Sequence, residues 1–146
     1  MDARTGLVRE DRVALYLRED RWSQHGIEFE YGSVEQAGYV PQKAVAFKMQ
    51  GPGELTGYVR VHYDPDETGE KSGTVTFSGL GGAPRAVELT FRPSRTSDYA
   101  DGRAGRPSGG EKISLQIPAG KHTLQIRGEA ADGSDLFAVL YWDGPM

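Results

Sequence analysis

Apolar and polar residues alternate along most of the chain, so that every second residue is apolar in one segment after another. A period of two is typical of β-strands that bury one side, and no long stretch repeats with the helical period of 3.6 residues. Only residues 34–37 suggest a helical turn. The pattern predicts about nine strands, at 13–17, 27–31, 45–49, 55–63, 75–77, 87–91, 113–117, 124–126 and 136–142.

The predicted fold is all-β: a single antiparallel two-sheet β-sandwich, jelly-roll-like, that spans residues 1–146. Strands with one polar side favour antiparallel pairing, and two such sheets bury their apolar sides against each other. A chain of 146 residues has the length of one ordinary domain. The side chains predicted to lie inside are Leu15, Phe29, Phe47, Val59, Val61, Phe77, Leu89, Leu115, Leu124, Ile126 and Leu140.

One segment, at about 93–110, interrupts the alternation. It reads PSRTSDYADGRAGRPSGG and shows no strand pattern over eighteen residues. Loops of this length inside a compact domain are uncommon and are usually either functional or disordered. We therefore expect a long flexible surface loop, and the sequence leaves open whether it has a function.

Composition and charge exclude several classes of protein. The chain has 17 basic and 21 acidic residues, a net charge of −4, and the charges are scattered, so we expect neither nucleic acid nor an anionic membrane surface as a partner. The absence of cysteine excludes disulfides and thiolate metal sites. The longest apolar run has seven residues, too few to span a bilayer. The charged N-terminus lacks a secretory signal, which leaves a cytoplasmic protein or a trimmed extracellular one.

Known catalytic motifs are missing from the sequence. There is no G-x-S-x-G nucleophile elbow and no H-E-x-x-H zinc motif, and the glycines at 79–82 join two strands as a hairpin turn. We therefore expect a protein that is not an enzyme, although a small enzyme with an unrecognised site stays as one alternative.

A metal site is suggested only near residues 62–69. The acidic stretch that begins at Asp64 and Asp66 starts like a calcium loop, but Val75 stands where an EF-hand requires a bidentate glutamate. A looser calcium site at Asp64 and Asp66 is the one cofactor that the sequence leaves open; otherwise none is expected. His62 and Asp64 lie on one side of a strand, where the carboxylate could orient the imidazole or both could hold a metal.

The clearest candidate for a ligand surface is an aromatic and polar cluster. Tyr58, Arg60 and His62 share the polar side of one predicted strand, and the 93–110 segment adds Tyr99 and Arg103. Exposed aromatic rings can stack on sugars while nearby polar groups bind the hydroxyls. This cluster predicts a glycan-binding surface.

The last predicted strand suggests a second kind of surface. Phe137, Val139 and Tyr141 occupy its second apolar side, and the 93–110 segment, rich in Gly, Ser and Arg, makes a poor apolar cover. We therefore expect a partner chain to cover these three residues, usually in a homo-oligomer. This supports the alternative function, a structural or assembly protein such as a virion, appendage or toxin subunit.

The stretch from Ile117 to Arg127, IPAGKHTLQIR, resembles a turn and strand that are common in extracellular jelly-roll and carbohydrate-binding β-sandwich modules. The resemblance covers about a dozen residues and transfers no functional residue. It implies a non-catalytic module that binds glycans or assembles on a larger protein. The sequence thus predicts a binding module, with carbohydrate as the first choice of ligand.

Overall fold

The computed structural model describes residues 5–9, 12–15, 24–29, 34–40, 42–95, 97–99 and 104–144, with the backbone alone for the residues before Val40 and for Val45 and Ser97. Within these ranges there are eleven strands and no helix, so none that could cross a membrane. The strands are β1 (Thr5–Arg9), β2 (Arg12–Leu15), β3 (Gln24–Phe29), β4 (Val34–Tyr39), β5 (Val45–Tyr63), β6 (Lys71–Ser78), β7 (Arg85–Phe91), β8 (Ser97–Tyr99), β9 (Arg106–Pro107), β10 (Glu111–Ala130) and β11 (Leu136–Asp143).

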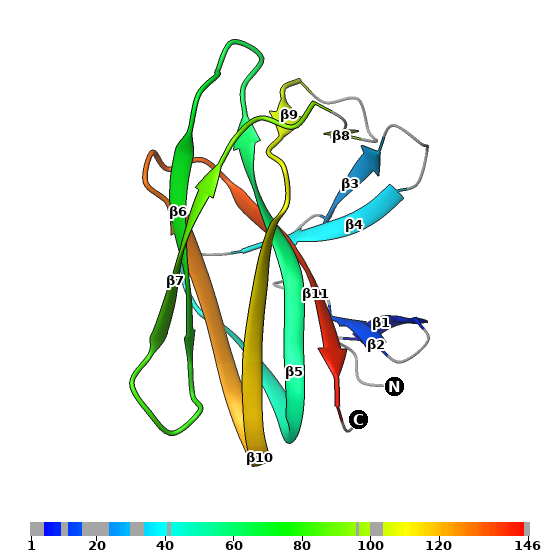
Figure 1. Ribbon diagram of the computed structural model, residues 1–146, viewed down its shortest axis with the longest axis vertical. Helices are drawn as coiled ribbons and strands as arrows, with labels where there is room; N and C mark the ends of the chain where they lie inside the picture. The colour runs from blue at the N-terminus through cyan, green and yellow to red at the C-terminus, as the bar shows by residue number, and fades with distance from the viewer. Residues whose placement is uncertain are drawn as a thin grey trace.

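Two long strands, β5 and β10, form an antiparallel ribbon that is the centre of the fold. The second half of β5 pairs with the first half of β10, from Val59 opposite Glu111 onward, and the first half of β5 pairs with the second half of β10. Figure 1 shows both strands folding back at the lower end of the molecule. The bend lies at residues 51–53 of β5 and 118–120 of β10, where the register shifts.

The bend requires residues without side chains. A Cβ atom on Gly51 would lie 2.0 Å from the carbonyl oxygen of Pro118, and one on Gly53 would lie 2.4 Å from the Trp142 ring. Gly120 has a φ of 103°, in the left-handed region that favours glycine. β10 has one residue more than β5 in the bend, so its buried positions change from odd numbers before the bend to even numbers after it.

Each half of the folded ribbon carries further strands, which gives two layers. The half formed by 53–63 and 111–117 continues through β11 to β2 and to β4, β3 and β8. The half formed by 45–50 and 121–130 continues through β6 to β7. All pairings between these strands are antiparallel.

The core lies between the two layers and takes its side chains from both. Phe47 and Leu124 come from one half of the ribbon, and Val59 and Leu115 from the other. The predicted antiparallel sandwich is confirmed. In the described residues, the predicted strands at 45–49 and 55–63 are one strand, β5, those at 113–117 and 124–126 are one strand, β10, and four further strands are present. Leu89 is only half-buried, and the side chains of Leu15 and Phe29 lie outside the described residues. The other predicted core residues are buried: Phe47, Val59, Val61, Phe77, Leu115, Leu124, Ile126 and Leu140.

Two local predictions were wrong. Residues 34–37 belong to strand β4, which pairs with β3 and β11, and do not form a helical turn. The 93–110 segment is not without strands, because β8 pairs with β3, β9 pairs with β5, and Pro93 bridges to Ser108. Short strands of two or three residues are too brief to produce an alternating pattern, so their neighbours in space decide them.

Replacing Phe77 with alanine tests the two-layer arrangement. Phe77 is fully buried in the core, so we expect its truncation to lower the free energy of unfolding by about 3–5 kcal/mol in denaturant titrations. Thr76→Ala, at the neighbouring position on the other side of β6, is the matched control and should cost far less. A loss below about 1 kcal/mol for Phe77→Ala would contradict this packing.

Candidate functional site

The outward side of β5 brings three of the predicted site residues together. Tyr58, Arg60 and His62 alternate along the strand with Val59 and Val61, which are fully buried in the core. Tyr58 is 45% exposed and is the one large apolar side chain in the described part of the chain that is open to solvent to this degree. An aromatic ring therefore stands in solvent beside two polar side chains on a rigid strand.

The segment 104–110 lies against the end of β5 and fixes Arg60. Its β9 pairs with His62 and Tyr63, and the carbonyl oxygen of Ser108 accepts a hydrogen bond of 2.8 Å from Arg60 Nη1. The hydroxyl of Ser108 accepts a hydrogen bond of 2.9 Å from the backbone N–H of Val61. Gly105 packs so closely that an added Cβ atom would lie 2.7 Å from the His62 ring.

The imidazole of His62 is held from both ends. Its Nε2 lies 2.9 Å from Asp64 Oδ1, and its Nδ1 lies 2.6 Å from the Tyr99 hydroxyl. A carboxylate only accepts, so Nε2–H donates to Asp64; in the tautomer with this single ring proton, Nδ1 accepts a hydrogen bond from the Tyr99 hydroxyl. The His62 and Tyr99 rings also stack, with centroids 5.7 Å apart. Asp64 thus orients the imidazole, one of the two roles that the sequence suggested for this pair.

Tyr99 holds His62 in place, but its own side chain is buried and not open to a ligand. Its side chain is only 4% exposed and packs edge-on against Phe137, with ring centroids 6.0 Å apart. The structure therefore brings Tyr99 to the predicted cluster as a partner of His62. Arg103, the fifth predicted residue, lies outside the described residues.

The same contact corrects the expected interface on β11. Phe137 and Tyr141 are buried within the chain, and the half-buried Val139 packs against the pair formed by Phe137 and Tyr99. From the 93–110 segment, Tyr99 covers Phe137 and contacts Val139. Among the described side chains of β11, these three therefore leave no apolar side open to a partner chain. The exposed apolar side was the observation that suggested self-association.

A buried ammonium group ties the turn after β5 to the turn after β10. The Lys71 side chain is 7% exposed. Its Nζ lies 2.9 Å from Glu67 Oε1, 3.1 Å from Asp132 Oδ2, 2.7 Å from Ser134 Oγ and 3.1 Å from the carbonyl oxygen of His62. Because one of these partners is the backbone of His62, Lys71 also holds the strand end that carries the imidazole.

Lys71 and the carboxylates around it shift one another's pKa values. Burial by itself would lower the pKa of Lys71, but its hydrogen bonds to Glu67 and Asp132 outweigh burial and raise it. Burial would raise the pKa of Asp132, but hydrogen bonds from Ser134 and Lys71 lower it to about 2. The pKa of Glu67 is lowered mainly by the backbone N–H of Asp64 and by Lys71. The carboxylates of this cluster are therefore held in their ionised form.

Calcium at Asp64 and Asp66 gains no support from this geometry. Asp64 is hydrogen-bonded to His62, Asp66 is exposed, and the nearby Glu67 and Asp132 both bind the ammonium of Lys71. In the part of the chain that the structure describes, no three His, Cys, Asp or Glu side chains are grouped to hold a metal ion. The ammonium of Lys71 supplies the positive charge that balances Glu67 and Asp132.

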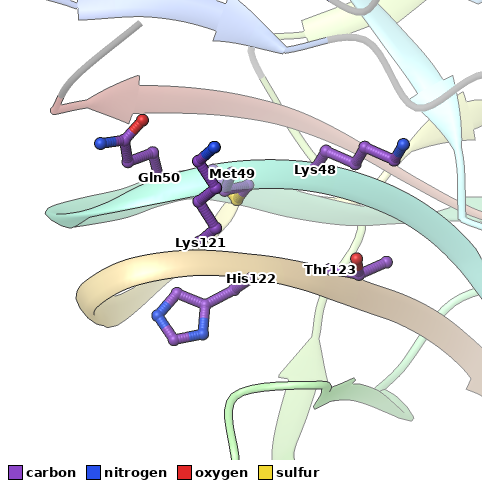
Figure 2. A pocket seen from close by; sticks show the side chains of 6 residues that line it. All are labelled: Lys48, Met49, Gln50, Lys121, His122 and Thr123. Atoms are coloured by element: carbon purple, nitrogen blue, oxygen red, sulfur yellow. The ribbon is translucent and has the colours of Figure 1, made fainter.

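A shallow cleft of about 340 Å³ lies near the bend of the ribbon, away from the Tyr58 site. Its walls come from Lys48 and Gln50 of β5 and Lys121 and Thr123 of β10, with Met49 and His122 between them. Figure 2 shows Lys48, Gln50 and Lys121 on one side of the ribbon and the His122 ring on the other. His122 Nε2 donates to the carbonyl oxygen of Pro118 at 2.9 Å, so the imidazole braces the turn.

Sequence reasoning did not identify Ser108 or Lys71 as parts of the site. Ser108 and its partner Val61 are 47 positions apart, and Lys71 and Ser134 are 63 apart. No local motif joins residues at such separations. The one available signal for Lys71 was a lysine after a run of carboxylates, which also occurs in ordinary polar turns.

No protein-family model and no curated protein sequence matches the chain. The solved structures that are similar to it at low identity include the following two. TmCBM61 in complex with β-1,4-galactotriose has 13% identity and a TM-score of 0.41, over 86% of this chain and 90% of that one. The GH26-CBM35 β-(1,4)-mannanase of Podospora anserina has 18% identity and a TM-score of 0.36, over 94% of this chain and 28% of that one. Both structures contain a carbohydrate-binding module.

Acid should selectively remove the contribution of Asp132 to stability. Its pKa falls from the ordinary 3.8 to about 2 on folding, so the stabilisation is present above about pH 4 and is lost as the pH falls through 2. We expect Asp132→Asn to lower the midpoint of denaturant unfolding at neutral pH and to match the parent chain near pH 2.

Lys71→Met provides the control for this experiment. In that background the ammonium partner is gone, so Asp132→Asn should have a smaller effect at neutral pH than in the parent chain, as a double-mutant cycle would measure. An Asp132→Asn effect that is constant from neutral pH to pH 2 would contradict the assignment.

Proposed function

We propose that this chain is a non-catalytic carbohydrate-binding module whose ligand lies against Tyr58, Arg60 and His62. The observation that carries the proposal is the exposed Tyr58 ring beside two polar side chains that the fold holds in place. Sugars present apolar C–H faces and hydroxyl edges. The Tyr58 ring matches the first feature and the Arg60 guanidinium the second. Both ring nitrogens of His62 already have partners, so His62 contributes the surface of its ring.

The site is organised before any ligand arrives. Arg60 is bonded to the Ser108 carbonyl, and His62 is fixed between Tyr99 and Asp64. Side chains that are already ordered lose little conformational freedom on binding, so more of the interaction energy appears as affinity. The tyrosine ring needs little ordering because it has only two side-chain torsions.

The carboxylates near the site have structural partners, which supports a role in binding over one in catalysis. Asp64 orients His62, and Glu67 and Asp132 bind Lys71. A glycosidase requires two carboxyl groups that flank the sugar, one of which must donate a proton. The low pKa of Asp132, about 2, is opposite to what a proton donor needs.

A glycan array followed by affinity electrophoresis on the retained polysaccharides tests this function. We expect Tyr58→Ala to abolish most of the retention while the melting temperature stays nearly unchanged, because the ring is exposed. Tyr58→Phe keeps the ring and should keep most of the retention.

Gln125→Ala, at an exposed position on the other layer, is the control and should bind like the parent chain. Retention that survives Tyr58→Ala would place the ligand elsewhere. Absence of retention on every glycan would reject the proposed function.

A further inference from the structure

The outward side of β5 continues as a polar strip from the Tyr58 site toward the bend. Thr56 and Glu54 follow Tyr58 at alternate positions, and each of the three lies opposite a residue of β10 in the register. The pairs are Tyr58 with Lys112, Thr56 with Ser114, and Glu54 with Gln116. All three β10 residues are exposed, so the strip is two strands wide and faces solvent.

The far end of the strip is ordered by hydrogen bonds across the strands. Glu54 Oε2 accepts from the Ser114 hydroxyl at 2.9 Å and from Gln116 Nε2 at 3.0 Å. Both bonds go to the same carboxylate oxygen. The donors and acceptors at this end are thus positioned on rigid strands in the same way as those around His62.

The dimensions of the strip select an extended ligand. At about 3.3 Å per residue, the path along β5 from Glu54 to His62 measures about 26 Å, which is longer than one sugar ring and suits several in a row. One long side of the strip is bordered by the covered residues Phe137 and Tyr141 of β11. The other long side is open, because β10 pairs over 111–117 with β5 alone among the described strands.

The charges of the strip favour a neutral ligand. Arg60 and Lys112 are cations, and Glu54 is an anion with the exposed Asp143 opposite it and Asp64 at the His62 end. Thr56, Ser114 and Gln116 are uncharged donors and acceptors. A polyanionic chain would have to lie against Glu54, and a polycationic one against Lys112. Hydroxyl groups can both donate and accept, so they match this mixture along the whole strip.

We infer that the site binds an internal stretch of a linear, neutral polysaccharide that lies along β5 from His62 to Glu54. This inference rests on the proposed function and extends it, because it names the class of glycan and adds Glu54, Ser114 and Gln116 as ligand contacts. Tyr58 lies within the strip and supplies the ring on which one sugar stacks.

Titration calorimetry with oligosaccharides of increasing length tests the inference. The probes are β-1,4-linked oligomers of glucose, mannose and galactose, from disaccharide to hexasaccharide, with oligogalacturonides as the acidic comparison. We expect the affinity for one neutral series to rise by roughly tenfold or more from disaccharide to hexasaccharide. The acidic series should bind more weakly at every length.

Two variants at the far end separate the strip from the Tyr58 site. Gln116→Ala and Glu54→Ala should weaken binding of the hexasaccharide severalfold and leave the disaccharide nearly unchanged, whereas Tyr58→Ala should weaken both. Gln125→Ala on the other layer is the control, and melting temperatures verify that every variant folds.

The outcomes distinguish the inference from the function on which it rests. Binding that does not depend on length, or equal losses for disaccharide and hexasaccharide in Gln116→Ala, would overturn the extended strip and leave a glycan-binding module. Tighter binding of the oligogalacturonides would overturn the neutral class. If no oligosaccharide and no arrayed glycan binds, both the proposed function and the inference fail.

Discussion

The folding of the β5–β10 ribbon onto itself is the constraint on which the rest of the structure depends. At the bend the backbones approach so closely that the positions of Gly51 and Gly53 have no room for a side chain. Closing the ribbon in this way brings its two halves face to face, so Phe47 and Leu115, from different halves, belong to one core. Each half then serves as the template on which further strands pair.

The same ribbon determines where a ligand can bind. Because side chains alternate along a strand, burying Val59 and Val61 necessarily turns Tyr58, Arg60 and His62 outward. A strand anchored in the core on one side is a rigid support for the other side. Figure 1 shows β8 and β9 gathered near the end of β5 that lies opposite the bend. β8 carries Tyr99 to the site, and Ser108 follows β9 directly.

Charge in this part of the molecule is largely compensated internally. Lys71 sits among Glu67, Asp132 and a carbonyl oxygen of β5, an arrangement of oxygens that would suit a cation from solution. An ammonium on the chain performs this role without a separate binding equilibrium. The two turns are thereby joined, and the carbonyl of His62 is held at the strand end beside its side-chain contacts with Asp64 and Tyr99.

The sequence by itself determined the strands with an alternating pattern, most of their buried sides and the cluster of Tyr58, Arg60 and His62. These depend on a period of two along one segment, and local alternation survives whatever the chain pairs with. The tertiary structure alone decided β8 and β9, because segments of two or three residues take their conformation from neighbours in space. It also decided β4, whose sequence VEQAGY does not alternate and which pairs with β3 and β11. It also decided that Tyr99 covers Phe137 and that Lys71 meets Asp132, since those contacts join residues far apart in the sequence. A local sequence pattern cannot predict such contacts. They form only after the ribbon has folded and its turns lie at fixed distances from one another.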